Sequence, residues 1–182
     1  MENEKKIQAT IKKLNMIYKK GYLPARETEE YSELHTGMVN CYGHACFNLS
    51  NEQLKELEPS KYDLRDFFRN FATRGARNIF SEVQNRIRQV GLKMERSSPN
   101  EKIQKNQWKI AYYIQNDIFA GNDLHFMIQT PNGKWTSKIG TNPTVEVFDK
   151  LPDVYHKNYS LSGVYKITNP YVKLENNDDM EM

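Results

Sequence analysis

The chain has 182 residues and a mass of 21.4 kDa, which fits one ordinary domain and excludes a multidomain machine. Its 26 Lys and Arg residues nearly balance 23 Asp and Glu residues, so the net charge of +3 is not that of an obligate nucleic-acid binder. Aromatic residues make up 12% of the chain, which excludes wholesale disorder, and a mean hydropathy of -0.82 predicts a modest core under a charged surface.

The first half of the chain is predicted to be helical. Apolar residues recur at helical spacing over 4–20, and a glycine and a proline that follow supply a stop. A short helix is predicted over 41–49, and Ser50 begins a capping box that opens another short turn. Apolar stripes over 64–71 and 79–90 predict two core helices.

The second half is predicted to form an antiparallel sheet. Residues 108–114 and 123–129 are rich in β-branched and aromatic residues, and a last strand is expected over 162–171. Asn132 and Gly133 stand between two such runs and predict a hairpin with a type I′ turn, because both residue types accept positive φ.

These elements predict one α+β domain over residues 1–172, with a helical half over 1–97 and a sheet half over 106–172. Residues 173–182 are acidic, and we expect a disordered tail there. No stretch approaches the roughly 18 apolar residues of a membrane span, and no apolar run follows the N-terminal lysines. We therefore expect a protein made in the cytoplasm without a membrane partner.

The segment NCYGHACF, Asn40 to Phe47, is the sharpest chemical feature of the sequence. Cys41 would stand at the first turn of a short helix, with Asn40 as its cap. Backbone N–H groups and the helix dipole stabilise a thiolate there and can lower its pKa below the free value of about 8.5. The same N–H groups can stabilise an oxyanion. The competing interpretation is a buried core cysteine, which we favour for Cys46.

Four histidines could accept the proton of a thiol: His35, His44, His125 and His156. His44 would lie along the side of the Cys41 helix, and two others lie in loop-like stretches. His125 stands on a predicted strand between Leu124 and Phe126. A cysteine on an early helix followed by a histidine on a later sheet is the order that Cys–His hydrolases use.

The residues around both groups resemble known motifs. NCYGHA is similar to the D-C-S-G motif of NlpC/P60-like peptidases, with Asn40 in place of the aspartate, and HFMIQ resembles their H-V-G-I-Y strand. The chain also resembles uncharacterised bacterial proteins with N-C-Y-x-Y-A, D-Y-H-W/F-x-x-Q and G-x-W-S-H-K-P-G segments, where it reads NCYGHA, DLHFMIQ and GKWTSKIG. The resemblance implies a papain-like fold, with Cys41 as nucleophile and His125 as general base.

The resemblance also implies a third polar group that orients the histidine, about a dozen residues after it, where this chain has Ser137. Serine is a weak orienting group. We therefore rank Gln129 first, since it shares a strand face with the histidine, then Asn142, Ser137 and Asp149.

The expected activity is cleavage or transfer of an amide or isopeptide bond in a protein or peptide through an acyl-enzyme, with water or an amine as acceptor. Asn40, Tyr42 and Trp135 are candidates to line the substrate cleft, although aromatic residues also serve simply as core. The chemistry implies no metal and no organic cofactor. An effector or toxin acting on a cytosolic protein is expected at least as much as a cell-wall enzyme, which would need specialised delivery.

Two rival functions use other features. The Arg-rich helices over 65–96 could bind nucleic acid or an acidic partner, although acidic residues intersperse them and favour a solvated helix face. A catalytically silent interaction domain of the same fold is the third hypothesis.

Overall fold

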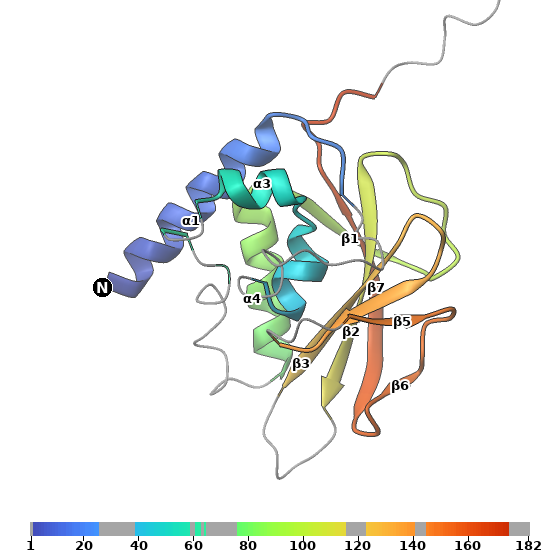
Figure 1. Ribbon diagram of the computed structural model, residues 1–182. Coiled ribbons are helices and arrows are strands. Elements are labelled where there is room, and N and C mark those ends of the chain that lie inside the picture. Colours follow the sequence, from blue (N-terminus) through green and yellow to red (C-terminus); the bar gives the residue numbers. More distant parts are fainter. Residues whose placement is uncertain are drawn as a thin grey trace, which may run out of the picture.

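The computed structural model describes residues 2–25, 39–58, 61–62, 64, 76–115, 123–140 and 145–174. Its helices gather on one face of an antiparallel sheet (Figure 1). The helices are α1 (Glu2–Lys19), the π-helix η1 (Gly43–Phe47), α3 (Asn51–Glu56) and α4 (Ala76–Gln89). The strands are β1 (Lys93–Ser97), β2 (Gln107–Gln115), β3 (Leu124–Gln129), β4 (Trp135–Lys138), β5 (Val145–Phe148), β6 (Val154–Tyr155) and β7 (Tyr159–Thr168).

The sheet runs in the order β1-β7-β2-β3-β4-β5, and β6 pairs with β7 beside this path. Every pairing is antiparallel, so successive side chains on each strand alternate between two faces. The helix face carries the main core, to which Trp108, Phe126 and Ile128 contribute. The opposite face carries a second apolar cluster that includes Tyr113, Met127, Trp135 and Tyr155.

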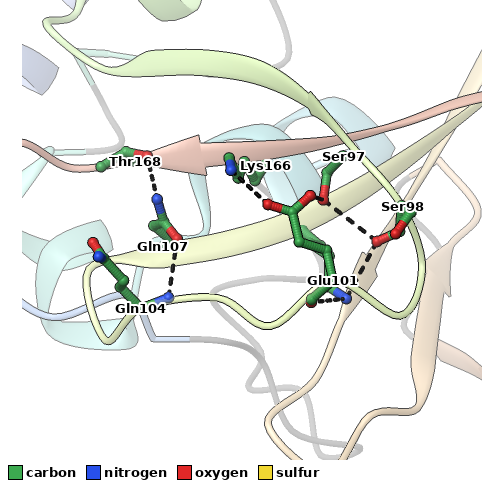
Figure 2. A network of polar contacts seen from close by, with 8 residues as sticks. Ser97, Ser98, Glu101, Gln104, Gln107, Lys166 and Thr168 are labelled. Carbon is green, nitrogen blue, oxygen red and sulfur yellow. Dashed lines mark hydrogen bonds and ion pairs between the residues drawn. The ribbon is translucent and has the colours of Figure 1, made fainter.

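A polar network fastens the connection between β1 and β2 to the sheet (Figure 2). Lys166 contacts the Glu101 carboxylate at 2.6 Å, and Ser97 donates to the other oxygen of that carboxylate at 2.7 Å. Lys109, only 3% exposed, donates from Nζ to the backbone carbonyl of Glu101 at 2.9 Å. The buried ammonium thus holds the loop that follows Ser98 against the face opposite the helices.

Several sequence predictions are confirmed. The helix predicted over 4–20 is α1, and the stripe over 79–90 corresponds to α4, which ends at Gln89, two residues before Gly91 with φ +89°. Ser50 makes the predicted capping box, since its hydroxyl accepts from the Gln53 N–H at 3.2 Å and its own N–H donates to Gln53 Oε1 at 2.8 Å. The stripe over 64–71 lies outside the described residues except for buried Leu64.

The hairpin between β3 and β4 is confirmed, but its turn differs from the predicted type I′. Gly133 has φ +85°, whereas Asn132 is not among the residues with positive φ. Thr130 N–H donates to the Lys134 carbonyl at 2.8 Å and Gly133 N–H to the Thr130 carbonyl at 3.0 Å. This is a three-residue loop with glycine at the left-handed position, because Pro131 lengthens the connection beyond two residues.

Three strands escaped prediction. β1 lies within the half predicted to be helical; its sequence KMERS holds no β-branched residue, and as an edge strand it is largely exposed. β5 and β6 are very short, and both lie at the margin of the sheet. Strands of this kind carry little of the alternation that marks a half-buried strand. Within the described ranges, no helix is long and apolar enough to cross a bilayer.

Candidate functional site

Cys41 stands at the start of the helical turn that leads into η1. Asn40 caps this turn, because its side-chain oxygen accepts from the Gly43 N–H at 3.1 Å and its carbonyl accepts from the His44 N–H at 2.9 Å. Gly43 is required by packing, since a Cβ there would lie 2.8 Å from Val39 Cγ1. The predicted helix start with an Asn40 cap is therefore present, although the helix that follows is a single π-type turn.

Cys41 lies where β3 and β4 separate. The ladder between these strands ends at the pair Met127–Ser137, although β3 begins earlier, at Leu124. The backbone of Phe126, in the stretch of β3 that β4 leaves unpaired, hydrogen-bonds the Cys41 thiol. The Cys41 thiol thus lies at the edge of β3, in the place that a paired strand would otherwise occupy.

The protonation state of Cys41 differs from the sequence expectation. Burial raises the pKa of the thiol to about 12, and the backbone hydrogen bond from Phe126 and the charge of Lys138 offset only part of this rise. We expected the helix start to lower the pKa, but one helical turn cannot compensate the desolvation of a side chain in a residue only 8% exposed. Cys46 is fully buried in the helix-face core, as expected of a structural cysteine, and neither cysteine is in a disulfide.

His125 lies on β3 one residue before Phe126, so its side chain points to the opposite face of the sheet from the helices. Its ring stacks on Tyr155, with centroids 4.5 Å apart and planes 13° from parallel. The Nε2 atom lies 2.7 Å from Ser137 Oγ. The Cys41 thiol thus contacts the residue next to His125 on β3, and no hydrogen bond joins the two side chains among the contacts of these two described residues.

Ser137 connects His125 to a longer polar chain. Its hydroxyl donates to the Tyr155 oxygen at 3.0 Å, and the Tyr155 hydroxyl donates to Glu146 Oε2 at 2.5 Å. The other carboxylate oxygen of Glu146 lies 3.1 Å from Nε2 of His156, whose side chain is 49% exposed. The chain therefore runs from a buried imidazole to the surface.

The imidazole of His125 is neutral at physiological pH. Burial lowers its pKa to about 4, the charge of Glu146 acts in the opposite direction, and His156 adds to the lowering. A neutral ring has one nitrogen with a lone pair and can act as a base. At neutral pH the site thus holds a neutral thiol and a neutral imidazole.

Of the three ranked partners of His125 that the structure describes, Ser137 is the one that contacts the ring. Gln129 shares the strand face, but its amide donates to the Gly133 carbonyl at the hairpin, 3.2 Å away. Asp149 lies 3.7 Å from Lys134 and its side chain is 88% exposed. Asn142 lies outside the described residues.

The three residues predicted to line a cleft have structural contacts. Asn40 serves as the cap described above. Tyr42 is buried on the helix face with its ring 4.9 Å from that of Phe126, and Trp135 is 2% exposed in the cluster on the opposite face. Among these three, Asn40 is therefore the one whose side-chain polar atom acts directly on the turn that carries Cys41.

Two buried groups, Lys138 and His44, were not selected as site members from the sequence, and His44 had been set aside because it would lie along the side of the helix. Lys138 is fully buried, its ammonium donates to the Gly140 carbonyl at 2.7 Å, and burial lowers its pKa to about 8. His44, 1% exposed, lies 3.2 Å from Thr136 Oγ1, and burial lowers its pKa to about 3. The lysine in the GKWTSKIG segment, which matches the lysine of the quoted bacterial pattern, was a usable signal for Lys138.

Tyr155 and Glu146 were also missed, and no sequence signal points to them. They lie on short strands, and their relation to His125 depends on tertiary contacts. Among the described residues, no group of three His, Cys, Asp or Glu side chains is placed to hold a metal ion.

The rival basic surface is visible only in part. Residues 65–75 lie outside the description, and Arg86, in α4, is buried and contacts Glu82 at 3.0 Å. An arginine held in this way does not present its guanidinium to a phosphate backbone. Arg88, Lys93 and Arg96, in the same stretch, are described and exposed. Nucleic-acid binding through residues 65–96 therefore stays a prediction that the structure does not test.

A family model described as a domain of unknown function (DUF7689) matches residues 36–165, so the chain belongs to this family. The matched region includes Cys41, His125, Ser137, Glu146 and Tyr155. No significant match was found among curated proteins or among solved structures.

Proposed function

We propose that this member of the DUF7689 family is a papain-like thiol hydrolase, in which Cys41 attacks the carbonyl of an amide or isopeptide bond and His125 is the general base. The observation that carries the proposal is that Cys41 and His125, far apart in the sequence, come to neighbouring positions on β3: the Cys41 thiol bonds the backbone of Phe126, and His125 is the residue before it. Ser137 holds the imidazole by Nε2, which leaves Nδ1 as the nitrogen to accept a proton.

The raised pKa of Cys41 and the lowered pKa of His125 favour general-base catalysis over a resting ion pair. As sulfur attacks the carbonyl carbon, the thiol proton passes to the imidazole, and the carbonyl electrons move to oxygen. The backbone N–H of Cys41, at the start of the helical turn, is the candidate donor to this oxyanion. The imidazolium then protonates the leaving amine, and water or a second amine releases the acyl group from sulfur.

Lys138 supports this assignment, because its charge is one of the factors that lower the pKa of Cys41. An ammonium near the sulfur stabilises negative charge as the thiol proton leaves. The proposed substrate is a protein or peptide. An effector role toward a cytosolic protein is part of the proposal.

The test uses p-nitrophenyl acetate, because an activated ester traps the acyl-enzyme whatever the natural substrate is. Intact mass should show one acetyl group, and peptide mapping should locate it on Cys41. The Cys41→Ala variant should lose this product, and His125→Ala should form it about 100-fold more slowly. Cys46→Ala is the matched control, since it removes a buried thiol of the same segment and should leave the rate unchanged.

Equal acetylation of the wild-type protein and the Cys41→Ala variant would overturn the proposal. That result would favour the catalytically silent interaction domain, which needs no reactive thiol.

A further inference from the structure

The polar chain that begins at His125 ends on a carboxylate, and this fixes the direction of every hydrogen bond in it. A carboxylate only accepts hydrogen bonds, so the short contact between Tyr155 and Glu146 is a donation from the tyrosine hydroxyl. The tyrosine oxygen is then available as an acceptor, and Ser137 donates to it at 3.0 Å. The donor and acceptor in each hydrogen bond are therefore set by the bond that lies nearer Glu146.

The last step decides the tautomer of the imidazole. A serine hydroxyl has a single proton, and Ser137 uses it toward Tyr155. The 2.7 Å contact between Ser137 Oγ and His125 Nε2 must then have the ring nitrogen as donor. We infer that Glu146 is a positioning residue that acts through Tyr155 and Ser137 to hold His125 in its Nε2–H tautomer, with the basic lone pair on Nδ1.

This inference deepens the proposed function, because it names the group that orients the general base, but the tautomer itself does not depend on catalysis. When Nδ1 accepts a proton, the Nε2–H bond to Ser137 remains, and the positive charge of the ring polarises the chain toward Glu146. No proton needs to travel along the chain. Glu146 thus plays the part of the orienting carboxylate through two intervening hydroxyl groups.

The backbone turn after β6 supports a specific placement of Tyr155 and His156. The turn after β6 has two successive non-glycine residues with positive φ, His156 at +44° and Lys157 at +64°. Such conformations are unfavourable for ordinary residues and persist where the surroundings impose them. Here the turn aligns Tyr155 over the His125 ring and brings His156 to the free oxygen of Glu146.

Several titratable groups surround the ring, and a test must separate them. Tyr155 stacks on it, Tyr159 meets it edge-on with centroids 6.1 Å apart, and Tyr113 is its register partner on β2. Asp123 accepts from the Tyr159 hydroxyl at 2.7 Å. Cys41 contacts the backbone of Phe126, the residue after His125 on β3. Of these groups, Tyr155 and, through it, Glu146 are joined to the ring by the continuous chain of hydrogen bonds described above.

The experiment is nitrogen NMR of the full chain labelled with ¹⁵N-histidine at neutral pH, with the His125 signals assigned by their loss in His125→Ala. The wild-type ring should be almost entirely the Nε2–H tautomer. Glu146→Gln should shift it to a mixture, because an amide can donate to Tyr155 and so reverse the chain. Tyr155→Phe should do the same by freeing the Ser137 hydroxyl to donate to the ring.

His156→Gln is the matched control, because it removes the partner of the other Glu146 oxygen and leaves the chain to His125 intact. Its His125 signals should keep the wild-type tautomer. An Nδ1–H tautomer in the wild-type protein, or an unchanged tautomer in both Glu146→Gln and Tyr155→Phe, would overturn the inference.

The rate of Cys41 acetylation shows whether a failure concerns this inference or the proposed function. If both hold, Glu146→Gln slows acetylation about 10- to 100-fold, while His156→Gln does not. If the tautomer shifts as expected but Cys41 is never acetylated, the positioning role stands and the hydrolase proposal fails. If Cys41 is acetylated but the tautomer does not respond to Glu146→Gln, only the positioning role fails.

Discussion

Two buried neutral histidines should make this fold sensitive to mild acid. The pKa of an unfolded histidine is about 6.5, whereas burial lowers the pKa of His44 to about 3 and that of His125 to about 4. At a pH between the unfolded and folded pKa values of a ring, the unfolded chain binds a proton on that ring and the folded chain does not. Stability is therefore complete above about pH 6.5 and is lost as the pH falls toward the folded-state values.

The magnitude follows from the shifts. At about pH 5 each ring lies roughly 1.5 pH units below its unfolded pKa and is still neutral in the fold, which costs about 2 kcal/mol per ring. The two rings together should remove about 4 kcal/mol between pH 7.5 and 5, a large part of the roughly 5–15 kcal/mol that stabilises a typical domain. Glu58 and Glu101, whose pKa values are lowered by hydrogen bonds from lysines, titrate below this window.

Urea unfolding of the wild-type protein and of His44→Gln at both pH values tests this reasoning. The glutamine retains a donor for Thr136 but does not titrate, so the pH-dependent loss should fall from about 4 to about 2 kcal/mol. His156→Gln is the matched control, because that histidine is exposed, and it should retain the wild-type loss. An equal loss of stability in His44→Gln and the wild-type protein would refute the assignment of this pH dependence to the buried ring.

Three further outcomes are expected. Trp108→Phe should cost about 2 kcal/mol, measured by urea unfolding, because the buried Ala45 carbonyl loses the 3.0 Å hydrogen bond from the indole; a loss below about 0.5 kcal/mol would contradict this. Ser50→Ala should cost about 1 kcal/mol through its capping box, and thermal melting with an unchanged midpoint would speak against it. At neutral pH, iodoacetamide should alkylate Cys41, assayed by intact mass in Cys46→Ala, on the order of 50-fold more slowly than free cysteine. The rate should still rise beyond about pH 9, and a plateau near neutral pH would be inconsistent with a buried neutral thiol.

Much of the local structure could be predicted from the sequence. The apolar periodicity of α1 and α4, the capping box at Ser50 and the glycine at the β3–β4 hairpin depend on residues a few positions apart. Interactions at such short separations are determined by the chain itself, whatever it later packs against. The placement of Cys41 at a helix start and of His125 on a strand followed for the same reason.

The surroundings of those two residues could not be predicted in the same way. Gln129 ranked first as a partner of His125 because strand periodicity places both on one face, but residues four apart on a strand lie too far apart to touch. The contact is made by Ser137, from the neighbouring strand, in a diagonal position that depends on the register of the pairing. Tyr155 and Glu146 reach the site from two more strands.

The acid–base state of the site was likewise decided by tertiary structure. A cysteine at a helix start predicts a lowered pKa when it faces water, yet Cys41 is buried against β3, and desolvation dominates. The sequence alone determined which residues stand at the ends and on the faces of local elements, because that is a matter of short-range geometry. Strand register and burial, which only the folded chain possesses, decided which of those residues meet and which of them carry a charge.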